Sequence, residues 1–423
     1  MTKRVVFVHT PCPELDDDRL EPPLGILYLA TLLKKQNVPC KICDLSSFPE
    51  KDWEHNLEFG NIYAFSTYSV TYHRTVKIKQ IIKSKINPYA ITIAGGPHAS
   101  ALPEEVKDDF DIVITGEAEL IFPQIIHSLL KGDQIKGTFL GKPISHLDYL
   151  PFPNYELIDL ASYHRLVEGL PALSIITSRG CPYKCTFCNS RVFERGQVRF
   201  RSPENVAKEI TFLKNKYGIK AYRFNDDLFA FSEQRVIEMC NALKPLNILY
   251  RIFVRADRLT TKVAKLLYDS GCRHVSIGIE TMSEKMLKLL NKGTTVQTNI
   301  NSLVNAKKAG LKTRIYLLIG YLGETDDTVQ ESLDILLQCD FDEFCVYPFI
   351  PYPGTPVWEE PQRFGAHINR DFSKYIQVGR RGNTFFAVTT TDFTPEDVKK
   401  WREMIISALQ KKALWAGKSP DNR

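Results

Sequence analysis

The chain has 423 residues, of which 43% are hydrophobic, so it is long enough for about two or three domains with buried cores. Its formal charge of +6 comes from 55 basic and 49 acidic side chains spread along the sequence, which argues against a nucleic-acid partner. No apolar run approaches the ~20 residues that span a bilayer. Ten cysteines in a chain without a secretory signal indicate metal binding or catalysis rather than a disulfide framework. The sequence therefore predicts a cytoplasmic protein with no membrane span.

Residues 1–149 alternate short β-branched runs with amphipathic stretches. We expect strands at 4–9, 40–44, 62–66, 90–94 and 111–115, with helices near 24–35, 73–85 and 119–130. This alternation predicts parallel strands and right-handed crossovers, hence an open doubly wound, Rossmann-like sheet. Ligands bind beyond the C-terminal strand ends of such sheets. The candidate residues there are Ser66, Thr67, Gly95, Gly96, Pro97, His98, Gly116 and Glu117.

Residues 150–171 are rich in proline and read as an ordered linker. The alternation then resumes, with strands expected at 172–177, 221–224, 250–254, 274–279, 313–319 and 343–347. Six strand–helix units over 172–356 predict a partial (β/α)6 barrel of the TIM type, with its site at the C-terminal strand ends. Residues 357–423 read as a small helical cap, whose helix begins at Thr394-Pro395.

Three cysteines lie in one short loop directly after the first barrel strand. Cys181, Cys185 and Cys188 have the spacing C-x3-C-x2-C, and three thiolates suit an iron–sulfur cluster with one iron left open. Phe187, beside the last cysteine, is expected to shield that cluster from water. Structural zinc is the alternative, but it needs a fourth cysteine or histidine, and none lies close in the sequence.

This motif, with an aromatic residue before its third cysteine, resembles that of the radical S-adenosylmethionine (SAM) superfamily. The resemblance implies a [4Fe-4S] cluster whose open iron binds the amino and carboxylate groups of S-adenosylmethionine. An electron, delivered by a donor such as flavodoxin or ferredoxin, then cleaves the cofactor to methionine and a 5′-deoxyadenosyl radical.

Charged segments after the next barrel strands are similar to cofactor-binding segments of the same superfamily. Asn225, Asp226 and Asp227 follow the second strand, Arg255 ends the third, and Glu280 ends the fourth. The resemblance implies that these residues hold the amine, carboxylate or ribose of the cofactor. A solvated turn with a helix cap remains the alternative for Asp226-Asp227, and surface ion pairs remain the alternative for Arg255 and Glu280.

The order of motifs in the N-terminal half resembles the cobalamin-binding subfamily of these enzymes. The segments are Pro22-Pro23-Leu24-Gly25, Ala94-Gly95-Gly96-Pro97-His98, Thr115-Gly116-Glu117 and Leu150-Pro151-Phe152-Pro153. No Asp-x-His-x-x-Gly segment, which supplies a histidine to cobalt in other cobalamin proteins, is present. We therefore expect His98 to cap the following helix or to lie in the core rather than to ligate cobalt.

Three functions compete at this stage. The first is a cobalamin-dependent radical methyltransferase that methylates an unactivated carbon of a small molecule. The second is a radical SAM cyclase, isomerase or oxidase that binds cobalamin without methyl transfer, or does not bind it. The third is a non-catalytic iron–sulfur protein, which explains the barrel and the acidic segment poorly.

Overall fold

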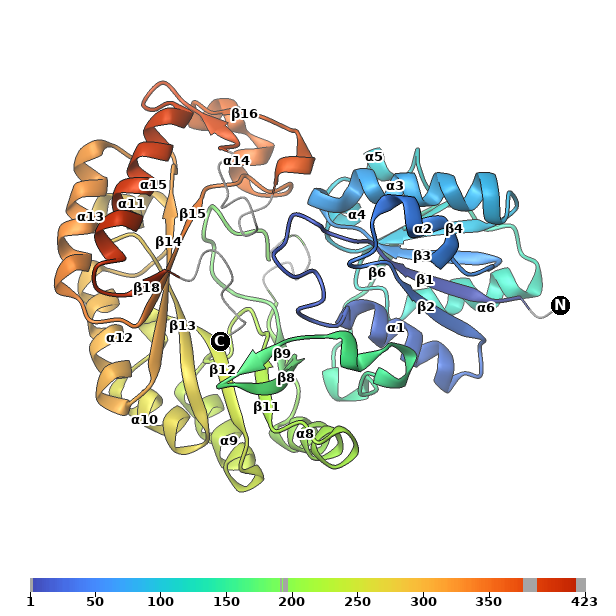
Figure 1. Ribbon diagram of the computed structural model, residues 1–423, viewed down its shortest axis with the longest axis horizontal. Coiled ribbons are helices and arrows are strands. Elements are labelled where there is room, and N and C mark those ends of the chain that lie inside the picture. The colour runs from blue at the N-terminus through green and yellow to red at the C-terminus, as the bar shows by residue number, and fades with distance from the viewer. Residues whose placement is uncertain (1–2, 191, 193–196, 376–385, 416–423) are drawn as a thin grey trace. The chain divides into compact units, whose positions relative to one another are not determined.

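The computed structural model describes residues 3–190, 192, 197–375 and 386–415, which form two compact units (Figure 1). The first unit contains the described residues up to His164, together with Val192 and residues 371–375. The second contains the other described residues. Within these ranges, no helix has the length and apolar character that crossing a membrane requires.

The first unit is built on a parallel six-stranded sheet in the order β2-β1-β3-β4-β5-β6. Five of these strands were predicted, and the edge strand β6 was missed because its short sequence GTFLG carries glycine at both ends. The doubly wound prediction is confirmed. The strands are β1 (Val5–His9), β2 (Cys40–Asp44), β3 (Ile62–Ser66), β4 (Ile91–Gly95), β5 (Ile112–Gly116) and β6 (Gly137–Gly141).

Helices cover both faces of this sheet (Figure 1). Alternate residues of β1 enter two separate cores, with Val5 and Phe7 in one and Val6 and Val8 in the other. The first core includes residues of α1 and α6, and the second includes residues of α3, α4 and α5. These helices are α1 (Leu24–Lys35), α3 (Tyr72–Ile81), α4 (Pro97–Ala101), α5 (Pro103–Val106) and α6 (Ile121–Lys131), with a short α2 (Trp53–Asn56).

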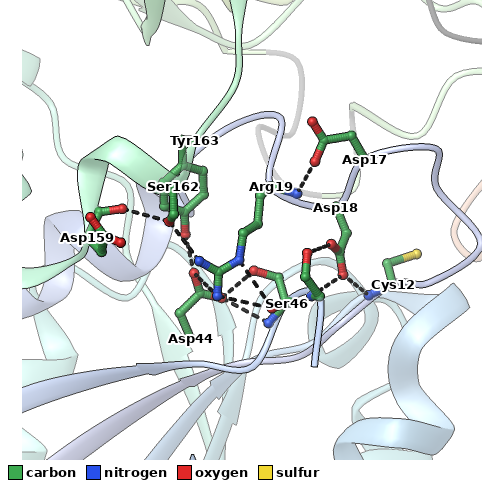
Figure 2. A network of polar contacts seen from close by, with 10 residues as sticks. Cys12, Asp17, Asp18, Arg19, Asp44, Ser46, Asp159, Ser162 and Tyr163 are labelled. Carbon is green, nitrogen blue, oxygen red and sulfur yellow. Dashed lines mark hydrogen bonds and ion pairs between the residues drawn. The ribbon is translucent and has the colours of Figure 1, made fainter. Parts of the chain in front are cut away.

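Residues 159–163, within the expected linker, are fastened to the first unit by a polar network (Figure 2). Tyr163 donates a hydrogen bond of 2.5 Å from its hydroxyl to Asp44, at the end of β2. Arg19 donates to the carbonyl of Ser46 at 3.1 and 3.2 Å and to the hydroxyl of Ser162 at 2.7 Å. The loop after β1 is therefore held at the C-terminal edge of the sheet.

The second unit is an eight-stranded sheet, β18-β15-β14-β13-β12-β11-β8-β7, that curls into a half-barrel. All neighbours are parallel except β7 and β8, which confirms the partial barrel. The strands are β7 (Leu166–Val167), β8 (Leu170–Ile175), β11 (Ala221–Phe224), β12 (Leu249–Arg255), β13 (Cys272–Glu280), β14 (Lys312–Ile319), β15 (Glu343–Pro348) and β18 (Leu414–Trp415).

Helices surround the half-barrel on its outer side (Figure 1). They are α8 (Pro203–Tyr217), α9 (Glu233–Leu243), α10 (Thr261–Asp269), α11 (Glu284–Leu289), α12 (Val296–Ala309) and α13 (Asp326–Gln338). Tyr222 of β11 reaches the carbonyl of Ile210 in α8 with its hydroxyl, at 3.2 Å. Successive side chains of a strand point to opposite faces of the sheet. Every second residue of a barrel strand therefore faces the helices, and the others face the concave interior.

Aromatic side chains of the strands on either side of β13 meet in the concave face. Gly278 and Ser276 belong to the strand that lies between β12 and β14. The ring of Phe253 on β12 and that of Tyr316 on β14 have centroids 5.7 Å apart, and Tyr316 lies 5.7 Å from Tyr347 on β15. An aromatic row therefore lines the barrel interior across three strands.

The C-terminal region adds α14 (Pro356–Glu359), the two-stranded β16 (His367–Ile368) and β17 (Val388–Thr389), and α15 (Pro395–Leu409). Thr394 caps α15 in a capping box with Asp397, where the sequence predicted the start of the helix. Trp401 donates 2.5 Å to Asp326 of α13, and Val398 packs against Gly320 at the end of β14. This region therefore covers part of the half-barrel.

Candidate functional site

The cysteine loop is held at the ends of the first two barrel strands. Asp226 is 4% exposed and accepts hydrogen bonds from both the backbone N–H of Thr177, at 2.6 Å, and its hydroxyl. Asp227 accepts from the backbone N–H of Gly180, the residue before the first cysteine. Burial raises the pKa of Asp226, and the hydrogen bonds from residues 177 and 178 oppose that shift. Asp226 is therefore a buried, hydrogen-bonded carboxyl group and not part of a solvated turn. The neighbouring Asn225 is exposed.

The far side of the loop is tied to residues 289–291. Thr186 donates from its backbone to the carbonyl of Leu290 at 3.0 Å, and Asn291 donates from its amide to the carbonyl of Lys184 at 2.8 Å. Tyr321, after β14, donates 2.6 Å to the Thr186 hydroxyl. Long-range contacts of this kind hold the cysteines in place, and sequence reasoning missed them.

The three cysteines are all partly buried and unpaired, and none of the chain's ten cysteines forms a disulfide. Burial raises the pKa of the Cys181 and Cys185 thiols, and the positive charges of Lys292 and Arg255 act against this shift at Cys185. Within the described ranges, no three His, Cys, Asp or Glu side chains converge on one point, as a single zinc ion would require. A cluster that takes one thiolate per iron fits the loop better.

Phe187 lies where the sequence placed it, beside the cysteines. It packs against a hydrophobic cluster that includes Leu290, Tyr321 and Phe349, and the Lys292 ammonium lies 5.5 Å from its ring centre. The apolar surroundings support the expected shielding role.

Arg255 ends β12 with every guanidinium nitrogen in use. Its Nε donates 2.9 Å to Asp257, Nη2 donates 2.7 Å to the carbonyl of Lys292, and Nη1 lies 3.7 Å from the Cys185 sulfur. Its guanidinium carbon is 3.5 Å from the centre of the Tyr183 ring. Arg255 is 8% exposed, so this is no ordinary surface ion pair.

Glu280 ends β13 in a left-handed conformation, with φ of 64°. Its carboxylate lies 2.7 Å from the ammonium of Lys292, and both side chains are nearly buried. Gly278 makes this possible, since a Cβ there would lie 2.6 Å from the Glu280 carboxylate. Glu280 therefore forms a nearly buried ion pair and not the surface ion pair that was the alternative to cofactor binding.

In the first unit, six of the expected ligand-site residues form one cluster at the ends of β3 and β4. Thr67 donates to the carbonyl of Gly95 from its backbone at 2.7 Å and from its hydroxyl at 2.8 Å. Its own carbonyl accepts from the His98 N–H at 3.0 Å. Gly96 has φ of 92° and crosses so close that a Cβ would lie 2.9 Å from the Ser66 hydroxyl. Ser66, Gly95, Gly96 and Pro97 are partly exposed at this edge, and the small residues among them leave room for a bulky ligand.

His98 is the second residue of α4, whose N-cap is Gly96, so the expectation that His98 caps the helix is wrong. The alternative core role fits, because the ring is 1% exposed and stacks on Tyr72, with centroids 4.2 Å apart. Its Nδ1 is 3.0 Å from the Ser69 hydroxyl, and its Nε2 is buried without a hydrogen-bond partner among the described residues. Burial lowers the pKa of His98 to about 4, so the ring is neutral at neutral pH.

Gly116 and Glu117 lie one strand further along, at the end of β5. The Gly116 N–H donates 2.9 Å to the Ser100 hydroxyl, which links it to α4. Glu117 is 8% exposed and accepts from the Ile144 N–H at 2.9 Å. Its carboxylate therefore fixes the segment after β6.

Comparison with known proteins agrees with this architecture. The family model of the radical SAM superfamily matches residues 175–336, and that of the B12 binding domain matches residues 19–126. A protein named as an uncharacterized methyltransferase of Pyrococcus horikoshii is 30% identical over 389 residues, covering 84% of this chain and 82% of the relative. The anaerobic magnesium-protoporphyrin IX monomethyl ester cyclase of Rubrivivax gelatinosus is 24% identical, covering 88% and 72%.

Among solved structures, the radical SAM methyltransferase TsrM from Kitasatospora setae, with cobalamin and a [4Fe-4S] cluster bound, superposes with a TM-score of 0.74. It is 16% identical, and the match covers 98% of this chain and 91% of TsrM, so the fold is shared. The fold, the cysteine loop and the sequence matches define a radical SAM enzyme. This chain belongs to the radical SAM superfamily, in its cobalamin-binding branch, and its cofactors are a [4Fe-4S] cluster, S-adenosylmethionine and cobalamin.

Proposed function

We propose that the chain is a cobalamin-dependent radical methyltransferase, which methylates an unactivated carbon of a small molecule in the cytoplasm. The observation that carries this proposal is that one chain combines the cysteine loop of a half-barrel with a B12-type sheet. A 30% identical relative is named as a methyltransferase. Bound together, the cluster and S-adenosylmethionine supply a carbon radical, and cobalamin supplies the methyl group. A flavodoxin or ferredoxin is the proposed electron donor.

The residues of the chain would divide the work between the units. Cys181, Cys185 and Cys188 hold the cluster, with Phe187 excluding water. Asn225 and the backbone near Asp227 stand at the strand end where S-adenosylmethionine would bind. The aromatic row of Phe253, Tyr316 and Tyr347 forms one wall of the barrel interior, and bulky rings suit a site that must keep a radical from water. The cluster of Ser66, Thr67, Gly95, Gly96, Pro97 and His98 would hold the cobalamin.

The proposal is tested by anaerobic purification from cobalamin-supplied cells, with iron and cobalt quantified. About four irons and one cobalt per chain are expected. The protein is then reduced and given S-adenosylmethionine with a deuterated methyl group, and its extracted corrinoid is analysed by mass spectrometry. A labelled methyl group on the corrinoid supports the methyltransferase.

Formation of 5′-deoxyadenosine with no label on the corrinoid would contradict methyl transfer. It would favour the alternative of a radical SAM cyclase, the activity for which one of the relatives is named. Replacing Cys185 by Ala should abolish 5′-deoxyadenosine while the cobalt content is kept. Cys12→Ala is the matched control, because Cys12 is also partly buried but lies outside the cluster loop.

A further inference from the structure

The guanidinium of Arg255 is locked in one orientation. Two of its nitrogens donate to Asp257 and to the carbonyl of Lys292, at 2.9 and 2.7 Å. The guanidinium carbon lies over the Tyr183 ring, 3.5 Å from the ring centre. The Tyr183 ring is fixed in turn, since its hydroxyl donates 3.1 Å to Asp257 and accepts from Arg258 at 2.6 and 2.9 Å. A residue held this way cannot readily swing to a ligand.

The remaining nitrogen, Nη1, is directed at the sulfur of Cys185, 3.7 Å away. The other two cysteines have different neighbours, since Cys188 has the Ser190 hydroxyl at 3.4 Å. Among the described residues, Arg255 is the one charged side chain that donates a hydrogen bond to a cysteine of the loop. The three thiolates of the cluster are therefore inequivalent.

We propose that Arg255 is a positioning residue of the iron–sulfur cluster, whose hydrogen bond to the Cys185 sulfur raises the reduction potential of the cluster. This rests on the cluster of the proposed function. One electron added to the cluster increases its negative charge, and an N–H group from a cation on a ligating sulfur stabilises that charge. The proposal replaces the role suggested by family resemblance, in which Arg255 pairs with the carboxylate of S-adenosylmethionine.

The test compares three variants of the full-length, cluster-loaded protein. Arg255→Gln removes both the charge and the guanidinium group. Arg255→Lys keeps the charge, but its single ammonium group cannot contact Asp257, Lys292 and Cys185 together. Arg258→Gln is the matched control, because Arg258 contacts the same Tyr183 hydroxyl and Asp257 but no cysteine sulfur is among its partners. The midpoint potential is measured without S-adenosylmethionine, by titration of the reduced-cluster electron paramagnetic resonance signal with dithionite. The affinity for S-adenosylmethionine is measured by calorimetry.

We expect the midpoint potential of Arg255→Gln to move to a more negative value and that of Arg255→Lys to move less in the same direction. Arg258→Gln should keep the wild-type potential, because Tyr183 retains its hydrogen bond to Asp257 and Arg255 retains its own three contacts. The dissociation constant for S-adenosylmethionine should change by less than about threefold in the Arg255 variants. If Arg255→Gln cannot retain its cluster, the midpoint potential of Arg255→Lys tests the proposal instead. Unchanged potentials with a large loss of affinity would overturn the proposal and restore the carboxylate role. A wild-type protein that lacks cobalt would refute the proposed methyl transfer alone.

Discussion

The ammonium of Lys292 lies 2.7 Å from the carboxylate of Glu280, in a nearly buried ion pair at the end of β13. Lys292 contributes a second contact through its backbone carbonyl, which accepts 2.7 Å from Arg255. One residue therefore joins the ends of β12 and β13 beside the cysteine loop. Gly278 leaves the space that the pair occupies.

Replacing Lys292 by Met should destabilise the fold, because it leaves the Glu280 carboxylate buried without its partner. Losses of this kind cost about 3–5 kcal/mol. Urea unfolding under anaerobic conditions measures the change in the free energy of unfolding. Lys288→Met is the control, since Lys288 is exposed, and it should change little. The double variant with Glu280→Gln should regain part of the loss, and equal stabilities of the single and double variants would contradict the coupling.

Gly96→Ala should lower both stability and cobalamin retention. Gly96 has φ of 92°, and a Cβ would lie 2.9 to 3.1 Å from the Ser66 hydroxyl and from backbone atoms of Thr67. Gly132 is the matched control, because it has φ of 103° with nothing within 4 Å of its Cβ position. At Gly132, whose ψ is 7°, alanine costs roughly 1–2 kcal/mol of backbone strain. Gly96 has ψ of −169°, in a region that essentially only glycine adopts, so both the strain and the clash are larger there.

Cobalt per chain after gel filtration, together with thermal unfolding, separates the two glycine variants. Gly132→Ala should keep the wild-type cobalt content, and Gly96→Ala should lose at least half of it. Equal cobalt in both variants would mean that the end of β4 does not form the corrinoid site.

The alternation of strand and helix patterns along the sequence predicted both sheets, because each pattern lies within one short segment and consecutive segments pack as neighbours. β6 escaped detection because an edge strand such as GTFLG buries too little to show a period. The cysteine loop, Asp226 and Arg255 were found from motifs, whereas Thr177, Tyr183 and Lys292 were not. Their contacts span 49 to 74 residues of sequence, or run through a backbone carbonyl that no side-chain pattern reveals.

Glu324 gives the stability a specific pH dependence. It is 3% exposed, and burial raises its pKa to about 8, despite hydrogen bonds from the Gly320 and Tyr321 N–H groups. Between the unfolded pKa near 4.5 and the folded pKa, the folded protein holds more protons than the unfolded one. The contribution of Glu324 is therefore fully present below pH 4.5 and is lost as the pH rises through 8.

Glu324→Gln should remove this dependence, since glutamine stays neutral and its oxygen still accepts from Gly320. The loss in the wild type approaches about 1.4 kcal/mol per pH unit. Urea unfolding at pH 6 and pH 8 measures the two slopes. A variant that loses as much stability as the wild type over this interval would show that another group is responsible.

Asp226 should control how firmly the cluster is held. It fastens both the N–H and the hydroxyl of Thr177, so Asp226→Ala frees the strand end from which the cysteine loop departs. A buried donor left without its acceptor costs about 1–3 kcal/mol. We expect iron to pass to a chelator several-fold faster from this variant than from the wild type. Asn225→Ala is the control, because the Asn225 side chain is exposed and its backbone N–H, which donates 2.8 Å to Ile175, is unchanged. Iron should leave Asn225→Ala at the wild-type rate, whereas its affinity for S-adenosylmethionine should fall. Equal rates of iron loss in the wild type and Asp226→Ala would show that the cysteines alone fix the loop.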